Sequence, residues 1–158
     1  VVQTTTTAPD GSYLFSGVRP GTYQVEFEKP NGFTFTTKDA GGNDAKDSDA
    51  DLVTGRTPLK TYISGDVDRD VDAGLWRPVT IGDKAWLDVN GNGIQDGGAE
   101  VGLAGVTVKL YDATTGALLG TQVTDSNGNY LFTGLKPGSF REEWTAPTSY
   151  VFTPRDQG

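Results

Sequence analysis

The sequence predicts an all-β protein built as an antiparallel β-sandwich. Apolar and polar residues alternate over short runs, which is the pattern of half-buried strands. Turn signals rich in glycine and proline separate these runs, and no stretch keeps a helical period. The composition agrees with this prediction, because 35% hydrophobic residues with 22 glycines and 8 prolines is typical of many short strands joined by tight turns.

Three runs carry the alternation most clearly: "TYQVEF" (22–27), "RDVDAGLW" (69–76) and "VTVKLYD" (106–112). In the last run, Val106, Val108 and Leu110 are predicted to share one buried face. The segment "DSNG" (125–128) is predicted to form a β-turn. Short strands at this spacing favour a sandwich over other all-β folds.

One strand carries a charge on its apolar face. Glu142 shares that face with Phe140 and Trp144, and a buried carboxylate is costly without a partner. Either this face is open, or a cation such as Arg141 of a neighbouring strand or a lysine reaches it. Glu143 lies on the opposite face, so the two adjacent acids cannot act together as a glycosidase pair.

The overall charge and the missing residue types exclude several function classes. A net charge of −8, with a pI near 4.4, repels nucleic acid and anionic lipid and attracts cations. No apolar run approaches the length of a membrane span, so we expect no membrane insertion of this segment. The absence of histidine and cysteine removes the usual general base and thiol chemistry. We therefore expect no nucleic-acid partner and no enzyme activity.

The chain repeats itself at long range. Residues 1–41 align without a gap to residues 118–158, at an offset of 117 and with 15 identical positions. A period of this length indicates tandem domains rather than a solenoid. We expect residues 1–78 to be the C-terminal part of one repeat and residues 79–158 the N-terminal part of the next, in an internal piece of a longer protein or in a matured product.

This offset frame has a consequence for assembly. The two parts are not expected to close together into a single sandwich. Neighbouring repeats or copies of the chain would then complete each part by strand complementation, which in separate copies would build a filament.

A set of motifs in order along the chain resembles the B-repeat domain of serine-aspartate repeat adhesins, within the collagen-adhesin B-type (Cna B-like) group. The motifs are "KDAGGNDAKDSDAD" and "VDAGLW" in the first copy, and "IGDKAWLDVNGNGIQD", "GLAGVTVKLYD" and "TDSNGNYLFTGLKPG" in the second. The resemblance implies an immunoglobulin-like (prealbumin-like) sandwich repeated in tandem on bacterial surface proteins. It also implies calcium in the polar loops, which stiffens the rod.

The loop "DVNGNGIQDGGAE" (88–100) follows the spacing of an EF-hand-like calcium loop, with Gly93 at the sharp turn. Its candidate ligands at alternate positions are Asp88, Asn90, Asn92, the backbone carbonyl of Ile94, and Asp96. The Ile94 side chain is expected to plug the core. An EF-hand places a bidentate Glu at position 12, but Ala99 stands there and Glu100 follows at 13, so a ligand role for Glu100 stays open. The alternative is a solvated Gly-Asn turn.

A second acidic cluster comprises Asp44, Asp47, Asp49 and Asp51. The residues alone fit either a solvated loop or a cation site, and the resemblance implies a second calcium region. A third cluster at 66–70 contains Arg69 and favours a plain charged turn.

The leading functional interpretation is a non-enzymatic structural module, a calcium-stiffened spacer, stalk or fibre-forming repeat of a bacterial cell-surface or extracellular protein. One alternative is an adhesive module that binds carbohydrate or a host or matrix protein, and another is an accessory domain of a secreted hydrolase. The tryptophans help to distinguish a structural module from a carbohydrate-binding one. They form either a sugar platform or core and edge packing, and they are Trp76, Trp86 and Trp144.

Overall fold

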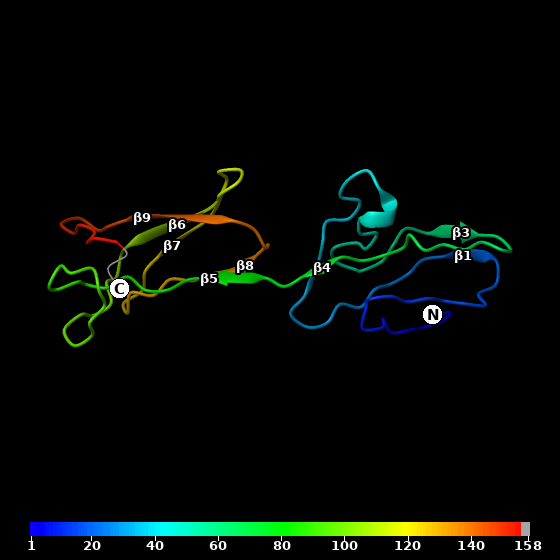
Figure 1. Cartoon of the computed structure of the whole chain (residues 1–158), viewed down its shortest axis with the longest axis horizontal. Coiled ribbons are helices and arrows are strands. Elements are labelled where there is room, and N and C mark those ends of the chain that lie inside the picture. The colour runs from blue at the N-terminus through cyan, green and yellow to red at the C-terminus, as the bar shows by residue number, and fades with distance from the viewer. Residues whose placement is uncertain (156–158) are drawn as a thin grey trace. The chain divides into compact units, whose positions relative to one another are not determined.

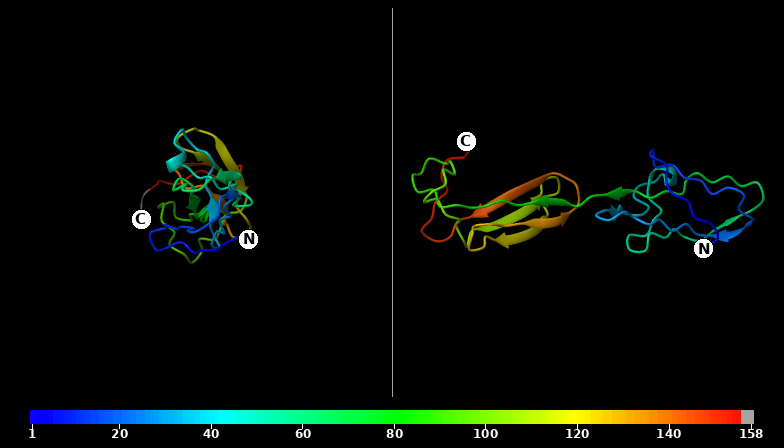
Figure 2. Two further views of the ribbon diagram at one scale, coloured as in Figure 1. Left: turned by 90° about the vertical axis from the view of Figure 1, so that its right-hand side faces the viewer. Right: turned by 90° about the horizontal axis from the view of Figure 1, so that it is seen from below.

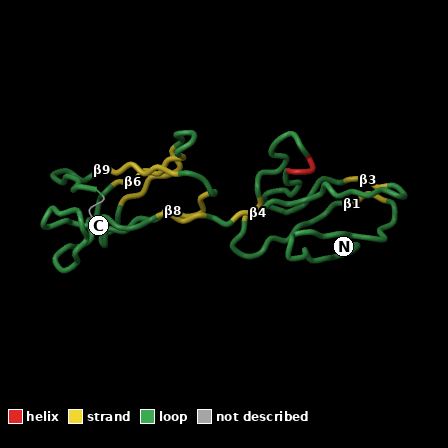
Figure 3. Tube along the Cα trace, viewed as in Figure 1, coloured by secondary structure: helices red, strands yellow, loops and turns green. Residues whose placement is uncertain are grey.

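The structure is a computed structural model that describes residues 1–155. The described chain is all-β apart from one 3-10 turn, η1 (Asp44–Lys46), which confirms the predicted fold class (Figure 3). The strands are β1 (Gly21–Tyr23), β2 (Thr34–Phe35), β3 (Lys60–Tyr62), β4 (Leu75–Trp76), β5 (Val79–Ile81), β6 (Thr107–Asp112), β7 (Leu118–Val123), β8 (Phe132–Leu135) and β9 (Phe140–Thr145). Within residues 1–155, no helix is long and apolar enough to cross a membrane.

The chain divides into two compact units, unit 1 (Val1–Leu75) and unit 2 (Trp76–Gly158) (Figure 1). Unit 1 contains the antiparallel pair β1–β3, and β2 pairs with β4 at its end. Unit 2 contains the antiparallel pair β5–β8 and the antiparallel sheet β7–β6–β9. Strand β4, which lies at the end of the predicted first repeat part, therefore pairs with β2 and not with β6. The last three residues of the predicted second part, 156–158, lie outside the described residues.

Unit 2 is a two-layer sandwich around one apolar cluster. Every second residue is buried as predicted, with Val106, just before β6, and Val108 and Leu110, within β6, at most 2% exposed. Tyr130 and Phe132 complete the buried cluster, and the partly buried residues packed against it are Ile81, Leu135, Phe140 and Trp144. These residues come from both layers, β5–β8 and β7–β6–β9, which Figures 1 and 2 show facing each other. Each fully buried aliphatic side chain contributes about 1.5–3 kcal/mol.

Unit 1 has a smaller buried core. Phe35 is 3% exposed and Ala50 is fully buried. Tyr13 contacts Phe15 and Phe27 edge to face, with ring centroids 5.7 and 5.6 Å apart, yet all three rings are only half-buried. The aromatic face of unit 1 is thus less covered than the core of unit 2.

The predicted turn at 125–128 forms and anchors the base of the long polar loop. The Oδ1 atom of Asp125 accepts hydrogen bonds from the N–H groups of Asn127 (2.8 Å) and Asn129 (2.9 Å). Gly128 closes the turn on the carbonyl of Asp125 at 2.9 Å, with a φ of 82° that favours glycine. Gly102 packs so closely on this turn that a Cβ there would lie 1.8 Å from the Asn127 carbonyl oxygen.

Candidate metal centre

The polar loop of unit 2 is closed at its base by the backbone. The N–H of Leu87 donates to the carbonyl of Val101 at 2.9 Å, and Trp86 forms an antiparallel bridge with Gly102. These contacts hold the two ends of the loop together, so residues 88–100 extend beyond the strands of the unit (Figure 1).

Asp88 organises the first half of this loop. Its Oδ1 atom accepts the N–H of Gly91 and its Oδ2 atom accepts the N–H of Gly93, both at 2.7 Å. Both glycines have left-handed backbone, with φ of 72° and 79°, which other residues rarely adopt. Desolvation raises the pKa of Asp88, but the hydrogen bonds from Gly93, Gly91 and the Thr153 side chain outweigh it and lower that pKa below its usual value. The loop therefore begins with an ionised carboxylate.

The two asparagines converge on Asp96. The amide nitrogens of Asn90 and Asn92 each donate to Oδ2 of Asp96 at 2.8 Å. Their amide oxygens accept the N–H groups of Asn92 (3.0 Å) and Ile94 (2.8 Å). Side chains at alternate positions of the loop thus meet at one point, as the sequence spacing predicts.

Glu100 belongs to the same cluster. Its Oε2 atom accepts the N–H of Asp96 at 2.8 Å. The residue is only 8% exposed, and its Oε1 atom is buried without a hydrogen-bond partner in the described chain. Gly97 and Gly98, both with positive φ, absorb the extra residue that separates Glu100 from the EF-hand spacing. A buried carboxylate oxygen without a partner is costly, and a bound cation would satisfy it.

The expectation for the Ile94 side chain is wrong. It is 38% exposed and is not a plug of the core. Closure of the loop at Leu87 and Val101 leaves residue 94 beyond the base of the loop, where the packed cluster around β6 is out of reach.

The second acidic cluster forms in part, and with a different membership. Asp49 and Asp72 are linked twice, because the N–H of Asp49 donates to the Asp72 carbonyl (3.0 Å) and the N–H of Asp72 donates to Oδ2 of Asp49 (2.8 Å). Oδ1 of Asp47 is buried without a hydrogen-bond partner in the described chain. Asp51 instead caps its own turn, since its Oδ1 atom accepts the N–H of Thr54 at 2.8 Å. Asp72 was not predicted, and its partner lies 23 residues away, so no local pattern marks it.

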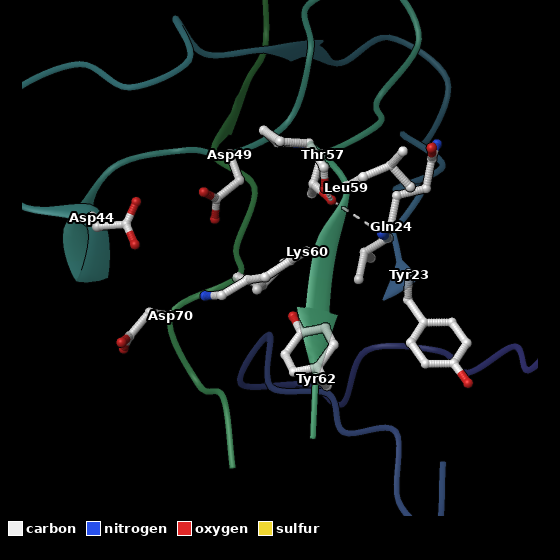
Figure 4. A pocket seen from close by; sticks show the side chains of 12 residues that line it. Tyr23, Gln24, Asp44, Asp49, Thr57, Leu59, Lys60, Tyr62 and Asp70 are labelled. Carbon is white, nitrogen blue, oxygen red and sulfur yellow. Dashed lines mark hydrogen bonds between the residues drawn. The ribbon is translucent and has the colours of Figure 1, made fainter. Parts of the chain in front are cut away.

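Burial, with a smaller contribution from mutual repulsion, raises the pKa values of Asp49 and Asp72. Burial, followed by the charges of Asp44, Asp39 and Asp47, raises the pKa of Asp49. Burial and the charge of Asp49 raise the pKa of Asp72 in the same way. Figure 4 shows Asp44, Asp49 and Asp70 around the ammonium group of Lys60. That ammonium forms an ion pair with Asp68 at 2.7 Å, so it neutralises part of this surface.

The predicted charged turn at 66–70 is structural. Oδ2 of Asp66 accepts the N–H of Ile63 at 2.8 Å, and Asp68 accepts the hydroxyl of Tyr62. Lysine and tyrosine partners therefore occupy the Asp68 carboxylate, which agrees with a plain charged turn.

Carboxylates alone do not build a metal site in the part of the chain that the structure describes. Among residues 1–155, no three Asp, Glu, His or Cys side chains gather closely enough to hold an ion by themselves. The 88–100 loop instead combines carboxylate, amide and backbone carbonyl oxygens. Hard cations such as calcium accept this mixture of oxygen ligands.

The three tryptophans are all partly buried. Trp144 packs edge to face on Tyr130, with ring centroids 5.0 Å apart, and belongs to the margin of the unit 2 core. The indole nitrogen of Trp86 is buried and has no hydrogen-bond partner in residues 1–155. This agrees with packing roles more than with an exposed sugar platform.

Comparison with known proteins gives the family. The family model described as "SdrD B-like domain" matches residues 1–75 and 79–158. The chain belongs to the SdrD B-like domain family. The resemblance seen in the sequence motifs is thereby confirmed.

Relatives of this SdrD B-like chain are much longer proteins. It is 41% identical over 160 residues to serine-aspartate repeat-containing protein D of Staphylococcus aureus (strain Newman). This alignment covers 100% of this chain and 12% of that protein. It is 37% identical over 158 residues to serine-aspartate repeat-containing protein F of Staphylococcus epidermidis (strain ATCC 12228 / FDA PCI 1200), covering 99% of this chain and 9% of that protein. The chain thus spans about a tenth of the length of these relatives.

Proposed function

We propose that this SdrD B-like chain is a non-enzymatic structural module, a calcium-stiffened spacer or fibre-forming repeat of a bacterial cell-surface or extracellular protein. Membership of the family and the internal repeat support the structural role. The polar loop of unit 2 supports the calcium, and its ligands are Asp88, Asn90, Asn92, the Ile94 carbonyl, Asp96 and Glu100.

The observation that carries the calcium proposal is the state of Glu100. Its Oε1 atom is buried and unpartnered, while its Oε2 atom is fixed by the N–H of Asp96. Calcium takes six to eight oxygen ligands, often with one bidentate carboxylate. An ion in this loop supplies the missing partner for Oε1 and offsets the cost of burying the charge.

The asparagine side chains fit the same proposal. Both amide groups already point at Asp96 through their nitrogen atoms. A half-turn of each amide about its Cβ–Cγ bond exchanges nitrogen for oxygen without moving the backbone. The point where Asn90, Asn92 and Asp96 meet can therefore hold either two N–H donors or a cation.

Calcium in this loop stiffens the module by ordering a glycine-rich segment. The segment has glycines at 91, 93, 97 and 98, and glycine loses more conformational freedom on ordering than any other residue. An ion that binds only the folded loop stabilises it by linkage. With only three carboxylates among its ligands, the loop should bind calcium with modest affinity, at about 10⁻⁴ to 10⁻³ M, as in extracellular modules.

A second calcium region is proposed in unit 1, with Asp44, Asp47 and Asp49. Other oxygen ligands would have to complete it, because within residues 1–155 the carboxylates do not gather closely enough to hold an ion by themselves. Asp72 is added to this region through its hydrogen bond to Asp49, whereas the predicted member Asp51 is engaged in its own turn. The unpartnered Oδ1 of Asp47 supports this region as Oε1 of Glu100 supports the first. A cation there would also offset the burial and the neighbouring negative charges that together raise the pKa values of Asp49 and Asp72.

The alternative functions have less support. A carbohydrate-binding adhesive module calls for exposed aromatic rings, whereas all three tryptophans are partly buried. Binding of a host or matrix protein, and fusion to a secreted hydrolase, rest on no specific feature of the described residues.

Thermal unfolding in calcium and in chelator tests the proposal. Trp86 and Trp144 lie within unit 2, whereas Trp76 belongs to β4, which pairs with β2 of unit 1. The measurements are therefore made in a Trp76→Phe background, in which tryptophan fluorescence follows unit 2. We expect chelation to lower the unfolding midpoint of the wild type and to have little effect on Glu100→Gln or Asp96→Ala. Asp112→Asn is the matched control, since it weakens the 112–116 turn of the same unit, where Oδ1 of Asp112 accepts the N–H groups of Thr114 and Thr115, and it should keep the full calcium effect. Equal midpoints for the wild type with and without calcium would rule the calcium role out.

A further inference from the structure

Asparagine is followed by glycine at four places in the chain, 31–32, 90–91, 92–93 and 127–128. Such a pair can lose the side-chain amide without an enzyme, because glycine has no Cβ to obstruct ring closure. The glycine nitrogen loses its proton and attacks Cγ of the asparagine, the new N–C bond closes a succinimide ring, and ammonia leaves. Water then opens the ring to aspartate or isoaspartate. The reaction therefore needs a glycine N–H that is free to ionise and to approach Cγ.

The two pairs in the polar loop of unit 2 do not meet this requirement. The N–H groups of Gly91 and Gly93 both donate to the carboxylate of Asp88 at 2.7 Å. Loss of a proton from either nitrogen would place a second negative charge beside that carboxylate, which is unfavourable. The side-chain amides of both asparagines are also held by Asp96, at 2.8 Å.

The pair at 127–128 is held by the turn that it forms. The N–H of Gly128 donates to the carbonyl of Asp125 at 2.9 Å, and Gly128 is buried. Gly102 packs against the Asn127 carbonyl so closely that a Cβ would not fit between them. The backbone at this pair therefore cannot rotate towards ring closure while the unit is folded.

The pair at 31–32 is open. It occupies the centre of a turn that the N–H of Phe33 closes on the carbonyl of Pro30 at 3.2 Å, and both central residues are exposed. Within residues 1–155, neither the N–H of Gly32 nor the side-chain amide of Asn31 makes a hydrogen bond. A Cβ placed on Gly32 would have no atom within 4 Å, so the turn has room around the reacting groups.

The same turn exists in unit 2 without an asparagine. At the offset of 117, the counterparts of the central residues are Thr148 and Ser149. The N–H of Tyr150 closes this turn on the carbonyl of Pro147 at 3.1 Å, and Ser149 has a φ of 76° where Gly32 has 80°. The turn therefore forms with an unreactive pair of residues as well.

We propose that Asn31 is a site of spontaneous deamidation in the folded chain, and that the hydrogen bonds of their glycine nitrogens protect the other three Asn-Gly pairs. The product adds a carboxylate to a chain whose net charge is already −8. Isoaspartate also adds a methylene group to the backbone shortly before β2, which carries the buried core residue Phe35. The reaction therefore alters the chain where it enters the core of unit 1.

Incubation of the full chain in mildly alkaline buffer with chelator tests the proposal. Mass spectrometry of proteolytic peptides follows each pair through the mass gained when water replaces ammonia. In the folded chain, we expect position 31 to deamidate at least about tenfold faster than positions 90, 92 and 127. In concentrated urea the four pairs should react at similar rates, because only the Asn-Gly sequence then matters.

Two variants separate the parts of the proposal. Asn31→Thr introduces the residue found in the second copy and should abolish the fast reaction. Asp88→Ala removes the acceptor of both loop glycines, so positions 90 and 92 should react at least about tenfold faster than in the wild type, while position 127 stays slow.

Two results would overturn the proposal. Equal rates at the four pairs in the folded wild type, or an unreactive Asn31 in a chain that deamidates in urea, would mean that the turn does not expose Asn31 to the reaction. Unchanged rates at positions 90 and 92 in Asp88→Ala would mean that the hydrogen bonds to Asp88 are not what protects the loop.

Discussion

The hydroxyl of Tyr130 donates a 3.0 Å hydrogen bond to Oε1 of Glu142 inside unit 2. This contact accounts for the carboxylate on the apolar face of β9, which sequence reasoning assigned to an open face or to a cation such as Arg141. Burial, followed by this bond and the charge of Glu142, raises the pKa of Tyr130, so the phenol stays protonated and keeps donating. In the first copy, Val25 replaces Glu142 and the matching hydroxyl of Tyr13 donates to the Val71 carbonyl at 2.7 Å.

The pair should show energetic coupling. Tyr130→Phe removes the donor and leaves Glu142 half-buried without it, at a cost of about 1–3 kcal/mol. Glu142→Val leaves the phenol without its acceptor, whereas Tyr130→Phe with Glu142→Val makes an apolar pair. The free energy of unfolding is measured in urea by tryptophan fluorescence. The double variant should lose at least about 0.5 kcal/mol less of it than the two single variants lose together. Additive losses would mean that the hydrogen bond does not stabilise the unit.

The core of unit 2 should depend on β6. Leu110 is fully buried, so Leu110→Ala is expected to cost about 2–5 kcal/mol from lost burial and the cavity left behind. Leu118→Ala on β7 is the control, because Leu118 is 55% exposed and should change stability by no more than about 0.5 kcal/mol. Similar losses in both variants, measured by urea unfolding, would contradict the assignment of the core.

The sequence patterns predicted the structural features that depend on residues close together in the chain. The alternation of Val106, Val108 and Leu110 and the turn at Asp125 depend on neighbours in sequence, and both are present. In the 88–96 loop, Asn90 and Asn92 both donate to Asp96, which agrees with the alternate spacing of these three residues.

Features set by distant contacts were missed. The partner of Glu142 lies on another segment, 12 residues away, and Asp72 joins Asp49 across 23 residues. The prediction that the Ile94 side chain lies in the core is wrong because the spacing of the loop residues does not show that the loop closes at Leu87 and Val101. Glu100 stayed open because its position depends on how Gly97 and Gly98 turn the chain.

The acidic cluster of unit 1 should respond to pH. Burial and the charge of Asp49 raise the folded-state pKa of Asp72, so protonation favours folding there. This contribution is present below the ordinary carboxyl pKa and is lost as pH rises through the raised value. In chelator, Asp72→Asn should therefore stabilise unit 1 at neutral pH. The wild type should gain protection of unit 1 amides as pH falls towards about 4, and the variant should gain less.

Asp51→Asn is the control with the opposite sign. Hydrogen bonds from Thr54 and Val53 lower the pKa of Asp51, so its contribution is present above the ordinary carboxyl pKa and is lost as pH falls through the lowered value. Loss of unit 1 protection in Asp72→Asn at neutral pH, measured by amide exchange in chelator, would contradict the repulsion argument.

Gly102 should be intolerant of any side chain. A Cβ there would lie 1.8 Å from the carbonyl oxygen of Asn127, so Gly102→Ala must displace the turn that anchors the polar loop. We expect a loss of more than about 2 kcal/mol in urea unfolding. Gly138→Ala is the control, since the nearest atom to its Cβ is 3.9 Å away. A Gly102→Ala protein as stable as Gly138→Ala would show that the turn does not pack on the loop base as described.

Calcium titration followed by NMR of the side-chain amides of Asn90 and Asn92 tests the central claim most directly. Both amides donate to Asp96 without the ion, and they must turn their oxygens towards a bound cation. We predict saturable shifts of these amide signals and of the Gly93 N–H, with half-saturation near 10⁻⁴ to 10⁻³ M, and no such shifts in Glu100→Gln at the same calcium. Unchanged Asn90 and Asn92 signals in the wild type, or shifts spread over the acidic surface without saturation, would contradict the calcium-binding role of this loop.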